Sequence, residues 1–431
     1  MNADCHRSPL SSDRTATRAQ VQRIRTWALL LLWSCQFGCT GFARDGELSD
    51  LGSLARSILG ANQGVYVESA DGSVLVAQAD SVPVHPASVS KVPTTLALLH
   101  RLGPEYRFIT TFAATGPVRD GLIEGDLVAD GGGDPYFVDE NALLVAQRLN
   151  ESGVRRVTGV LRVRGALLFN WQADGVAAPL QQALSGNTSV TAWTTVQALS
   201  PALQVPPALQ FAGAAPSAGS GTGDALAARP LVIHRSQPLL SLIKSLNDYS
   251  NNIFKPLADA AGGIGSVEGL ARQSVPETMR SEVILGDGAG TDPRNRLSPR
   301  AAVHLLQALE RELAVSGHTL VDVLPVSGID AGTLHDRLNG PDESGRIVGK
   351  TGTFGDYGAS ALIGAVPTTD RGTVYFAILN HGVPVSEARR RQDRFLRALL
   401  ARLSTSPWPY QPDLRPAVAR AEAVRVPPNG Q

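Results

Sequence analysis

Three short groups of polar residues in this chain carry side chains that could perform acyl transfer. They are Ser88 with Lys91, Ser250 with Asn252, and the string Lys350, Thr351, Gly352 and Thr353. The chain has only four lysines among its 39 Lys and Arg residues, and two of the four lie in these groups. A desolvated lysine can lose its proton near neutral pH, whereas arginine cannot. The placement indicates amine chemistry at positions 91 and 350, although a bias toward arginine would also make lysine scarce.

The order of the three groups is more informative than any one of them. Ser-x-x-Lys recurs at 241–244, and Ser-x-Asn recurs at 185–187 and 245–247. Lys-Thr-Gly is rarer, with about 0.02 chance occurrences expected in a chain of this composition. Ser88 opens a predicted helix, whereas the copy at 241 lies inside one and is predicted to be a surface pair. Ser250 falls at a break between two predicted helices, and the copy at 185 precedes a predicted strand.

Ser88 is the predicted nucleophile. A serine hydroxyl needs an adjacent base, and Lys91 lies one helical turn away on the same face. Burial and the positive charge of Lys350 would lower the pKa of the Lys91 amine toward neutrality. Asn252 would orient Lys91 or a substrate amide, and Ser250 would pass a proton to the leaving amine.

The string at 350–353 is predicted to lie on an edge strand that faces the cleft. Lys350, Thr351 and Thr353 would bind a substrate carboxylate, and the backbone N–H groups of Ser88 and Thr353 would form the oxyanion hole. The alternative for this string is a strand end with a bulge at Gly352. The chain has no Gly-x-Ser-x-Gly elbow, which argues against an α/β-hydrolase triad. Its eight histidines show no metal-ligand spacing, so neither a metal nor a cofactor is predicted.

Composition limits the class of protein. A chain of 431 residues with 43% hydrophobic and 18% charged residues is typical of a globular protein with two domains. Its formal net charge is zero, so no nucleic acid or anionic membrane surface is expected as a partner. The arginine run at 389–391 is predicted to be a solvated helix face.

The first 43 residues are predicted to be a secretory signal. Arginines precede a short apolar stretch at 27–33, and small residues up to Ala43 fit a cleavage site. All three cysteines lie in this segment, so no disulfide is expected afterwards. The expected location is periplasmic or otherwise extracytoplasmic. As an alternative, a lipid on Cys35 would anchor the protein peripherally to a membrane.

The pattern of elements predicts one α+β catalytic domain with an insertion. The catalytic domain takes residues 44–117 and 231–405, the inserted domain 118–230 with short strands and one helix, and the Pro-rich tail at 406–431 is expected to be peripheral. Helices are predicted at 47–59, 88–101, 139–151, 239–247, 251–261, 299–314 and 385–403, and strands at 65–67, 74–76, 107–115, 346–352, 359–366 and 373–380. The glycines at 131–133 are expected to form a loop, and Pro93 to kink the nucleophile helix.

At these residues the chain resembles the active-site serine penicillin-recognising enzymes. Within that group it is similar to the D-alanyl-D-alanine carboxypeptidase/endopeptidase family of the penicillin-binding protein 4 type, over most of residues 60–395. The similarity is carried by the three groups and by the strings at 86–88, 125–127, 131–135, 295–299, 324–328 and 332–334, together with Asp330. It implies a β-lactamase/transpeptidase-like antiparallel sheet flanked by helices, with a smaller inserted β-rich domain.

The resemblance also implies an activity. The enzyme would cleave peptidoglycan stem peptides through an acyl-enzyme on Ser88, and β-lactams would acylate the same serine. The family's roles carry over onto Ser88, Lys91, Ser250, Asn252 and the string at 350–353. Ala289 stands where relatives commonly have serine. Two alternatives stay open: a β-lactamase of the same fold, and a non-catalytic protein that binds the cell wall.

Overall fold

The first sheet joins the beginning and the end of the predicted catalytic domain, which is called the catalytic unit below. A computed structural model describes residues 50–215, 227–248, 253–355 and 358–427, and in it the strand order of this sheet is β13-β14-β15-β1-β2, antiparallel throughout. The strands are β1 (Gly64–Ser69), β2 (Val74–Gln78), β13 (Val348–Phe354), β14 (Ala359–Thr368) and β15 (Gly372–Asn380). β1 pairs with β15. The predicted front hairpin and the three predicted strands near the end of the chain are therefore confirmed.

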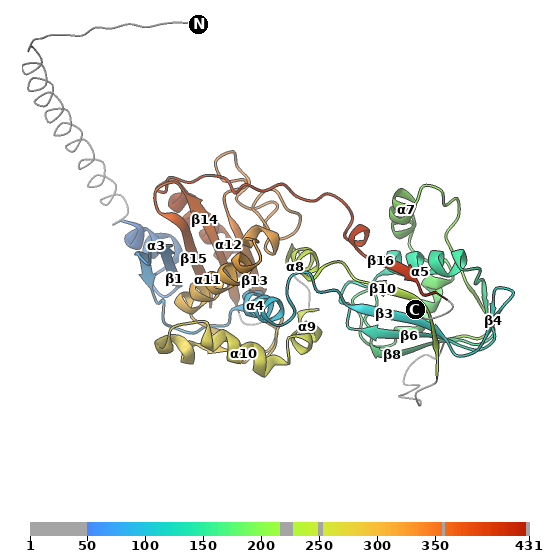
Figure 1. The fold of residues 1–431 in the computed structure, drawn as a ribbon. Coiled ribbons are helices and arrows are strands. Elements are labelled where there is room, and N and C mark those ends of the chain that lie inside the picture. The colour runs from blue at the N-terminus through green and yellow to red at the C-terminus, as the bar shows by residue number, and fades with distance from the viewer. Residues whose placement is uncertain (1–49, 216–226, 249–252, 356–357, 428–431) are drawn as a thin grey trace, which may run out of the picture.

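Helices cover both faces of this sheet, which is why β14 and β15 are buried over most of their length (Figure 1). Leu362 and Ile378 pack against α3 (Leu51–Leu59) and α12 (Val385–Leu400). Their neighbour Ile363 points to the opposite face, which packs against α4 (Lys91–Leu102) and α11 (Pro299–Val315). The α+β arrangement predicted from the sequence is thus observed, with a sheet between two layers of helices.

Further short elements complete the catalytic unit. They are α8 (Leu239–Asp248), α9 (Phe254–Ala260), α10 (Ile264–Gln273), the 3-10 helices η1 (Ala87–Ser90), η2 (Glu277–Glu282) and η3 (Leu320–Asp322), and the two-stranded sheet of β11 (Val283–Ile284) and β12 (Arg296–Leu297). α10 is absent from the predicted elements. α11 begins as predicted, because Ser298 Oγ accepts a hydrogen bond from Ala301 N and Pro299 occupies the first helical position. No helix among the described residues has the length and apolar character needed to cross a bilayer.

Pro93 does not kink the nucleophile helix. α4 begins at Lys91, so Pro93 is its third residue, where a backbone N–H has no partner within the helix. The carbonyl of Val89 accepts a hydrogen bond from Lys91 N instead. The expectation of a kink was wrong because the helix starts three residues later than predicted.

A second sheet forms the other unit, to the right in Figure 1. Its order is β16-β10-β3-β6-β8, and beside it lies a small sheet of order β4-β5-β7-β9. The bounds are β3 (Ile109–Ala114), β4 (Val118–Arg119), β5 (Leu122–Ile123), β6 (Leu127–Gly132), β7 (Arg156–Val157), β8 (Leu161–Ala166), β9 (Gln210–Phe211), β10 (Arg229–Arg235) and β16 (Glu422–Arg425). Three helices accompany them: α5 (Asp139–Glu151), α6 (Ala177–Leu184) and α7 (Val190–Leu199).

This second unit extends beyond the predicted boundaries of 118 and 230. β3 and β10, which the prediction assigned to the catalytic domain, pair with each other and place Phe112 and Val232 in the second core. The prediction of a single helix was also wrong, since α6 and α7 are helical and α7 replaces the strand expected after residue 187. Gly131 and Gly132 continue β6 rather than form a loop. Glycine suits this strand because a Cβ would lie 2.5 Å from Leu167 at position 131 and 2.3 Å from the carbonyl of Ile109 at position 132.

The Pro-rich tail is part of the fold rather than peripheral. It runs from the catalytic unit to the second unit (Figure 1), where η5 (Ala417–Arg420) leads into β16 at the edge of the second sheet. Tyr410 Oη donates a 2.6 Å hydrogen bond to Asp330, a buried carboxylate that also accepts from Lys244 Nζ at 2.5 Å. The tail therefore connects the two units through specific contacts.

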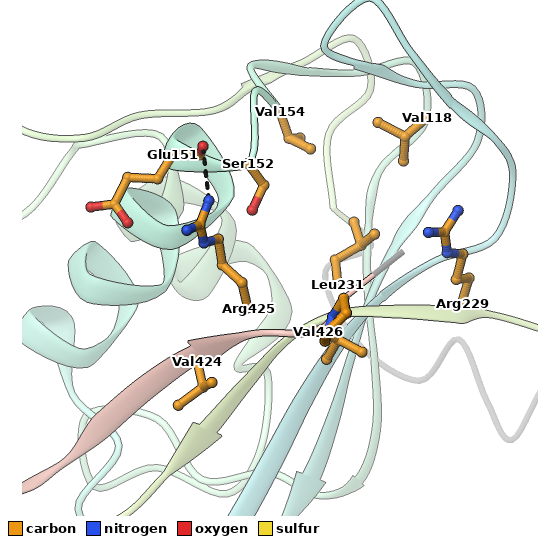
Figure 2. A pocket seen from close by; sticks show the side chains of 10 residues that line it. Val118, Glu151, Ser152, Val154, Arg229, Leu231, Val424, Arg425 and Val426 are labelled. Carbon is orange, nitrogen blue, oxygen red and sulfur yellow. Dashed lines mark hydrogen bonds between the residues drawn. The ribbon is translucent and has the colours of Figure 1, made fainter. Parts of the chain in front are cut away.

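The end of the tail also lines a cavity of about 760 Å³ in the second unit. Figure 2 shows its wall, with Arg425 donating a hydrogen bond to the carbonyl of Glu151 at 3.3 Å. Every residue that lines it belongs to the second unit or the tail, so none of the predicted site residues lies there.

The contacts of Tyr410 predict a measurable contribution of the tail to stability. Tyr410→Phe removes one hydrogen bond from Asp330 while two other donors stay, so the free energy of unfolding should fall by about 1 kcal/mol. Leu414→Ala, on the same tail at 88% exposure, is the control and should change it by less than about 0.5 kcal/mol. Denaturant unfolding measures both; equal values for the two variants would show that the tail is peripheral after all.

Candidate active site

Ser88 lies in a strained turn at the entrance to α4. The turn is η1, and its first residue, Ala87, has a φ of +49°, a conformation that L-residues rarely adopt. Ser88 is 7% exposed. Gly290 crosses directly over the turn, since a Cβ at that position would lie 1.9 Å from the carbonyl of Ala87. The backbone around the serine is therefore held in place by a second segment.

Lys91 reaches the serine as the helical spacing predicts. Its Nζ lies 2.8 Å from Ser88 Oγ and donates to the carbonyl of Ala289 at 2.9 Å. The side chain is 1% exposed, and burial, followed by the charge of Lys350, lowers its pKa to about 7, against a smaller opposing effect of Asp287. A large fraction of the amine is thus neutral at physiological pH. Ala289 contributes a carbonyl here, so its lack of a hydroxyl does not disturb this contact.

β13 brings the string at 350–353 to the same place. Lys350 is fully buried, its Nζ donates to the carbonyl of Thr351 at 3.2 Å, and burial lowers its pKa to about 8 although Asp248 opposes the shift. A Cβ at Gly352 would lie 2.6 Å from the carbonyl of Pro86 and 3.0 Å from Ser88 N. Glycine is therefore required at this position because the strand passes so close to the nucleophile turn.

The backbone of β13 presents N–H groups toward this turn. β13 is the edge of its sheet, and Gly349 N donates outward, to the carbonyl of Pro325, rather than to β14. N–H groups alternate in direction along a strand, and the pairing of β13 with β14 is regular, so the N–H of Thr353 points outward too.

The two threonines of the string have different neighbours. Thr351 is buried, and its Oγ1 donates to Oγ1 of Thr333 at 2.8 Å. Thr353 is exposed, and its Oγ1 accepts a 2.8 Å hydrogen bond from Nη2 of Arg389. The prediction that Arg389 belongs to a solvated helix face was therefore incomplete, because this arginine reaches the end of the site.

Ser250 and Asn252 lie outside the described residues, but the helix ends on either side of them border the site. α8 ends at Asp248, whose carbonyl accepts from Thr333 N at 3.1 Å and whose carboxyl pKa burial raises to about 7. α9 begins at Phe254, and Lys91 Nζ lies 5.5 Å from the centre of that ring.

His85 is a neighbour of the nucleophile that sequence reasoning missed. Its Nδ1 accepts a hydrogen bond from Ala87 N at 3.2 Å, and its Nε2 lies 3.1 Å from the carbonyl of Asp292. A carbonyl only accepts, so the proton is assigned to Nε2 and the ring is neutral. The ring also stacks on Phe354 at 4.7 Å. No spacing signal could have found it, because it acts on the backbone of Ala87, the residue before Ser88, and not through a side chain.

The loop at 286–292 completes the surroundings of Lys91. Asp287 accepts hydrogen bonds from Gly290 N at 2.7 Å and from Thr291 and Asn295. Burial opposes its ionisation, but these donors outweigh that effect and lower its pKa. Outside this loop a cavity of about 640 Å³ opens, lined by Asp287, by Lys255 of α9 and by Ala173 of the second unit.

The alternative copies of the motifs have structural partners. Lys244 donates to Asp330 and to the carbonyl of Leu324 at 2.6 Å, so it belongs to a largely buried ion pair and not to the surface pair with Ser241 that was predicted. Ser185 ends α6 and donates to the carbonyl of Gln181. In the part of the chain that the structure describes, no three His, Cys, Asp or Glu side chains gather as they would around a metal ion.

Several known proteins resemble this chain in sequence or in fold. "Carboxypeptidase DacB" of Mycolicibacterium smegmatis is 28% identical over 369 residues, 76% of this chain and 78% of that protein. The "predatory peptidoglycan endopeptidase" Bd3459 of Bdellovibrio bacteriovorus has a TM-score of 0.69 at 20% identity, covering 84% of this chain and 99% of that one. Penicillin-binding protein 4 (dacB) of Haemophilus influenzae has a TM-score of 0.57 at 17% identity, covering 81% and 99%.

These similarities confirm the predicted fold class, including its relation to penicillin-binding protein 4. Residues 49–173 and 208–402, well over half of the chain, match a family of known peptidases. The prediction of a D-Ala-D-Ala carboxypeptidase is confirmed by this match and by the carboxypeptidase relatives. The chain belongs to the D-Ala-D-Ala carboxypeptidase 3 (S13) family.

Proposed function

We propose that this carboxypeptidase acts on the stem peptides of peptidoglycan through an acyl-enzyme on Ser88. The observation that carries the proposal is the 2.8 Å contact between Ser88 Oγ and a buried amine whose pKa lies at about 7. A neutral amine at this distance can accept the hydroxyl proton while the oxygen attacks a carbonyl carbon. Arginine or a solvated lysine could not do so at neutral pH.

In the acylation step, Ser88 Oγ bonds to the carbonyl carbon of the penultimate D-Ala while Lys91 Nζ takes the hydroxyl proton. The carbonyl oxygen becomes an oxyanion, which the N–H groups of Ser88 and Thr353 would stabilise. When the C–N bond breaks, the leaving D-Ala amine takes a proton, relayed from Lys91 through Ser250 in this proposal. Water then attacks the ester carbon and gives a proton to Lys91, which passes it to Ser88 Oγ as the C–O bond breaks, so the shortened peptide leaves and both the serine hydroxyl and the neutral amine are restored.

The chain end of the substrate is an anion, and the site offers cations for it. Lys350 is a buried residue of β13, and Arg389 donates a hydrogen bond to Thr353 Oγ1 near the end of the same strand. The substrate carboxylate would replace the hydrogen bond between Arg389 and Thr353 and would pair with the charges of Lys350 and Arg389. Thr351 and Gly352 would shape the strand between these two cations.

Acylation by β-lactams follows from the same chemistry, because their strained amide presents a carbonyl and a carboxylate in a similar arrangement. A structural neighbour from Bdellovibrio bacteriovorus is described as penicillin G-acylated. A β-lactamase of the same fold is the alternative enzyme, and sustained nitrocefin hydrolysis rather than a single burst would identify it. A non-catalytic wall-binding protein would not be labelled by a fluorescent penicillin at all.

Peptidoglycan lies outside the cytoplasm, so we propose that the chain is exported, with residues 1–43 as its signal; these residues lie outside the described part. Cleavage after Ala43 would leave a mature protein in the periplasm, whereas a lipid on Cys35 would hold it at a membrane. The mass of the mature protein isolated from cells distinguishes the two.

The roles of Ser88 and Lys91 predict distinct effects on labelling by fluorescent penicillin. Ser88→Ala should abolish labelling, since it removes the oxygen that forms the ester. Lys91→Arg should slow it by at least about 100-fold, because arginine keeps the charge but cannot accept the proton. Ser241→Ala, in the second Ser-x-x-Lys copy, is the control and should label as the wild type does. Appreciable labelling of Lys91→Arg would remove Lys91 as the base.

The pKa of Lys91 predicts the pH dependence of acylation. The reactive form is the neutral amine, so the rate constant for labelling should rise with pH and level off above about 7, with one proton lost. Stopped-flow measurement of acylation by nitrocefin provides the profile. A plateau reached only near pH 10 would mean that the amine is not desolvated in solution.

Protonation of His85 is expected to add a second ionisation to the pH profile of the acylation rate constant. Protonation of Nδ1 would remove the acceptor for Ala87 N. Burial lowers the pKa of His85 below its usual 6.5, and the charge of Arg296 lowers it further, whereas Asp292 and Asp287 raise it. Below that pKa the logarithm of the acylation rate should fall with a slope near two. His85→Asn keeps an acceptor that does not titrate, so its slope should be about one. Identical slopes would show that His85 does not position the serine turn.

A further inference from the structure

A groove in the second unit has no role in the proposed acyl transfer. Its volume is about 390 Å³, and it lies between the start of α5, the start of α7 and the segment of the tail at 416–418. One wall carries two aromatic residues, Tyr136 and Trp171, whose rings meet edge to face at 4.8 Å and 87°. Its polar lining includes Asp139, Glu140 and Asn170, together with the threonines of α7.

Trp171 occupies a position that favours glycine. Phe169 and Gln172 exchange two backbone hydrogen bonds of 3.0 Å, so Asn170 and Trp171 are the central residues of a two-residue turn. Both have positive φ, +47° and +69°, which is the pattern of a type I′ turn. Asparagine suits the first position, but the second is disfavoured for a bulky residue. The indole is therefore placed there against the preference of the backbone.

Other contacts hold this turn against α5. Asn170 Nδ2 donates to Asp139 Oδ1 at 2.9 Å, and Asp139 N donates to Asn170 Oδ1 at 3.2 Å. Asn170 N donates to the carbonyl of Phe137 at 3.1 Å. The turn is thus rigid while Trp171 stays 42% exposed at the groove. Strain retained at an exposed aromatic side chain points to binding rather than to packing.

The chemistry of the groove fits a neutral ligand rich in hydroxyl groups. None of the residues that line it is cationic, so an anion would find no partner. Glu140 is half-buried, and burial raises its pKa, so its carboxylate gains from a new hydrogen-bond donor. An exposed indole face beside carboxylate, amide and hydroxyl groups can stack on the C–H face of a sugar ring while the polar groups bond its substituents.

The groove also lies close to a cavity that borders the 286–292 loop beside Lys91. Ala173, two residues after Trp171, lines the cavity that Asp287 and Lys255 border, so one short loop separates that cavity from the groove. We propose that this groove binds the glycan strand of peptidoglycan, a neutral chain of N-acetylated amino sugars. The proposal rests on the proposed function, because the stem peptide that would enter the active site is covalently attached to such a strand.

The test uses the β-1,4-linked tetramer of N-acetylglucosamine and the full mature chain. Calorimetry should detect binding to the wild type, and Trp171→Gly should weaken it by at least about tenfold. Glycine suits the turn, so this variant should keep its Tm within about 3 °C of the wild type. Trp171→Phe should retain most of the affinity. Trp193→Phe, on α7 but outside the groove, is the control and should bind as the wild type does.

The same variants separate this proposal from the proposed function. Trp171→Gly should raise the KM for polymeric peptidoglycan while leaving penicillin acylation of Ser88 unchanged. If Trp171→Gly does not fold, Glu140→Gln decides, with an expected loss of at least about fivefold in tetramer affinity. No tetramer binding to the wild type, or equal binding by all variants, overturns the glycan site, as does binding of a lysine-containing peptide in its place. Tetramer binding without penicillin acylation would instead overturn only the proposed function.

Discussion

The acyl transfer that we propose depends on keeping one lysine amine out of water. Lys91 is buried at 1% exposure beside a second buried lysine, and its pKa of about 7 lies some 3.5 units below the usual value of 10.5. This shift corresponds to roughly 5 kcal/mol against the charged form. Such an environment is unfavourable for folding, so it persists only because a large core surrounds it. The buried faces of α4, α9 and β13 supply that core.

Positioning the serine is a separate problem from activating it. Ala87 holds a strained conformation, and its neighbour His85 accepts from its N–H. Two segments far apart in sequence also contact the turn, since Gly290 crosses the carbonyl of Ala87 and Gly352 lies against Ser88 N. A side chain at either glycine would collide with the turn. The backbone at Ser88 is therefore held by the sheet edge and the 286–292 loop together.

The parts of this site that could be predicted from the sequence are those set by local geometry. The spacing of Ser88 and Lys91 on one helical face predicts their contact, and strong alternation predicts β13 to β15. Pairing partners are not local. Nothing in β3 or β10 reveals that they join each other rather than the catalytic sheet, and the tail strand β16 has too few residues to show a period. His85 acts through backbone groups, which leave no mark on spacing. The motifs still singled out Ser88, Lys91 and the string at 350–353, which the structure brings together.

Acyl transfer and the binding of a polymeric substrate would need different surroundings, which a single unit would provide poorly. Acyl transfer needs a dry site in which a lysine is neutral, whereas a polymeric substrate needs a wide polar surface. The catalytic unit meets the first demand with helices on both faces of its sheet. In our proposal the second unit meets the other with the exposed Trp171 and half-buried acidic side chains beside it, held by a rigid turn at Asn170 and Trp171. The tail, through Tyr410 and β16, bonds to both units, so it limits how far the groove can move from Ser88.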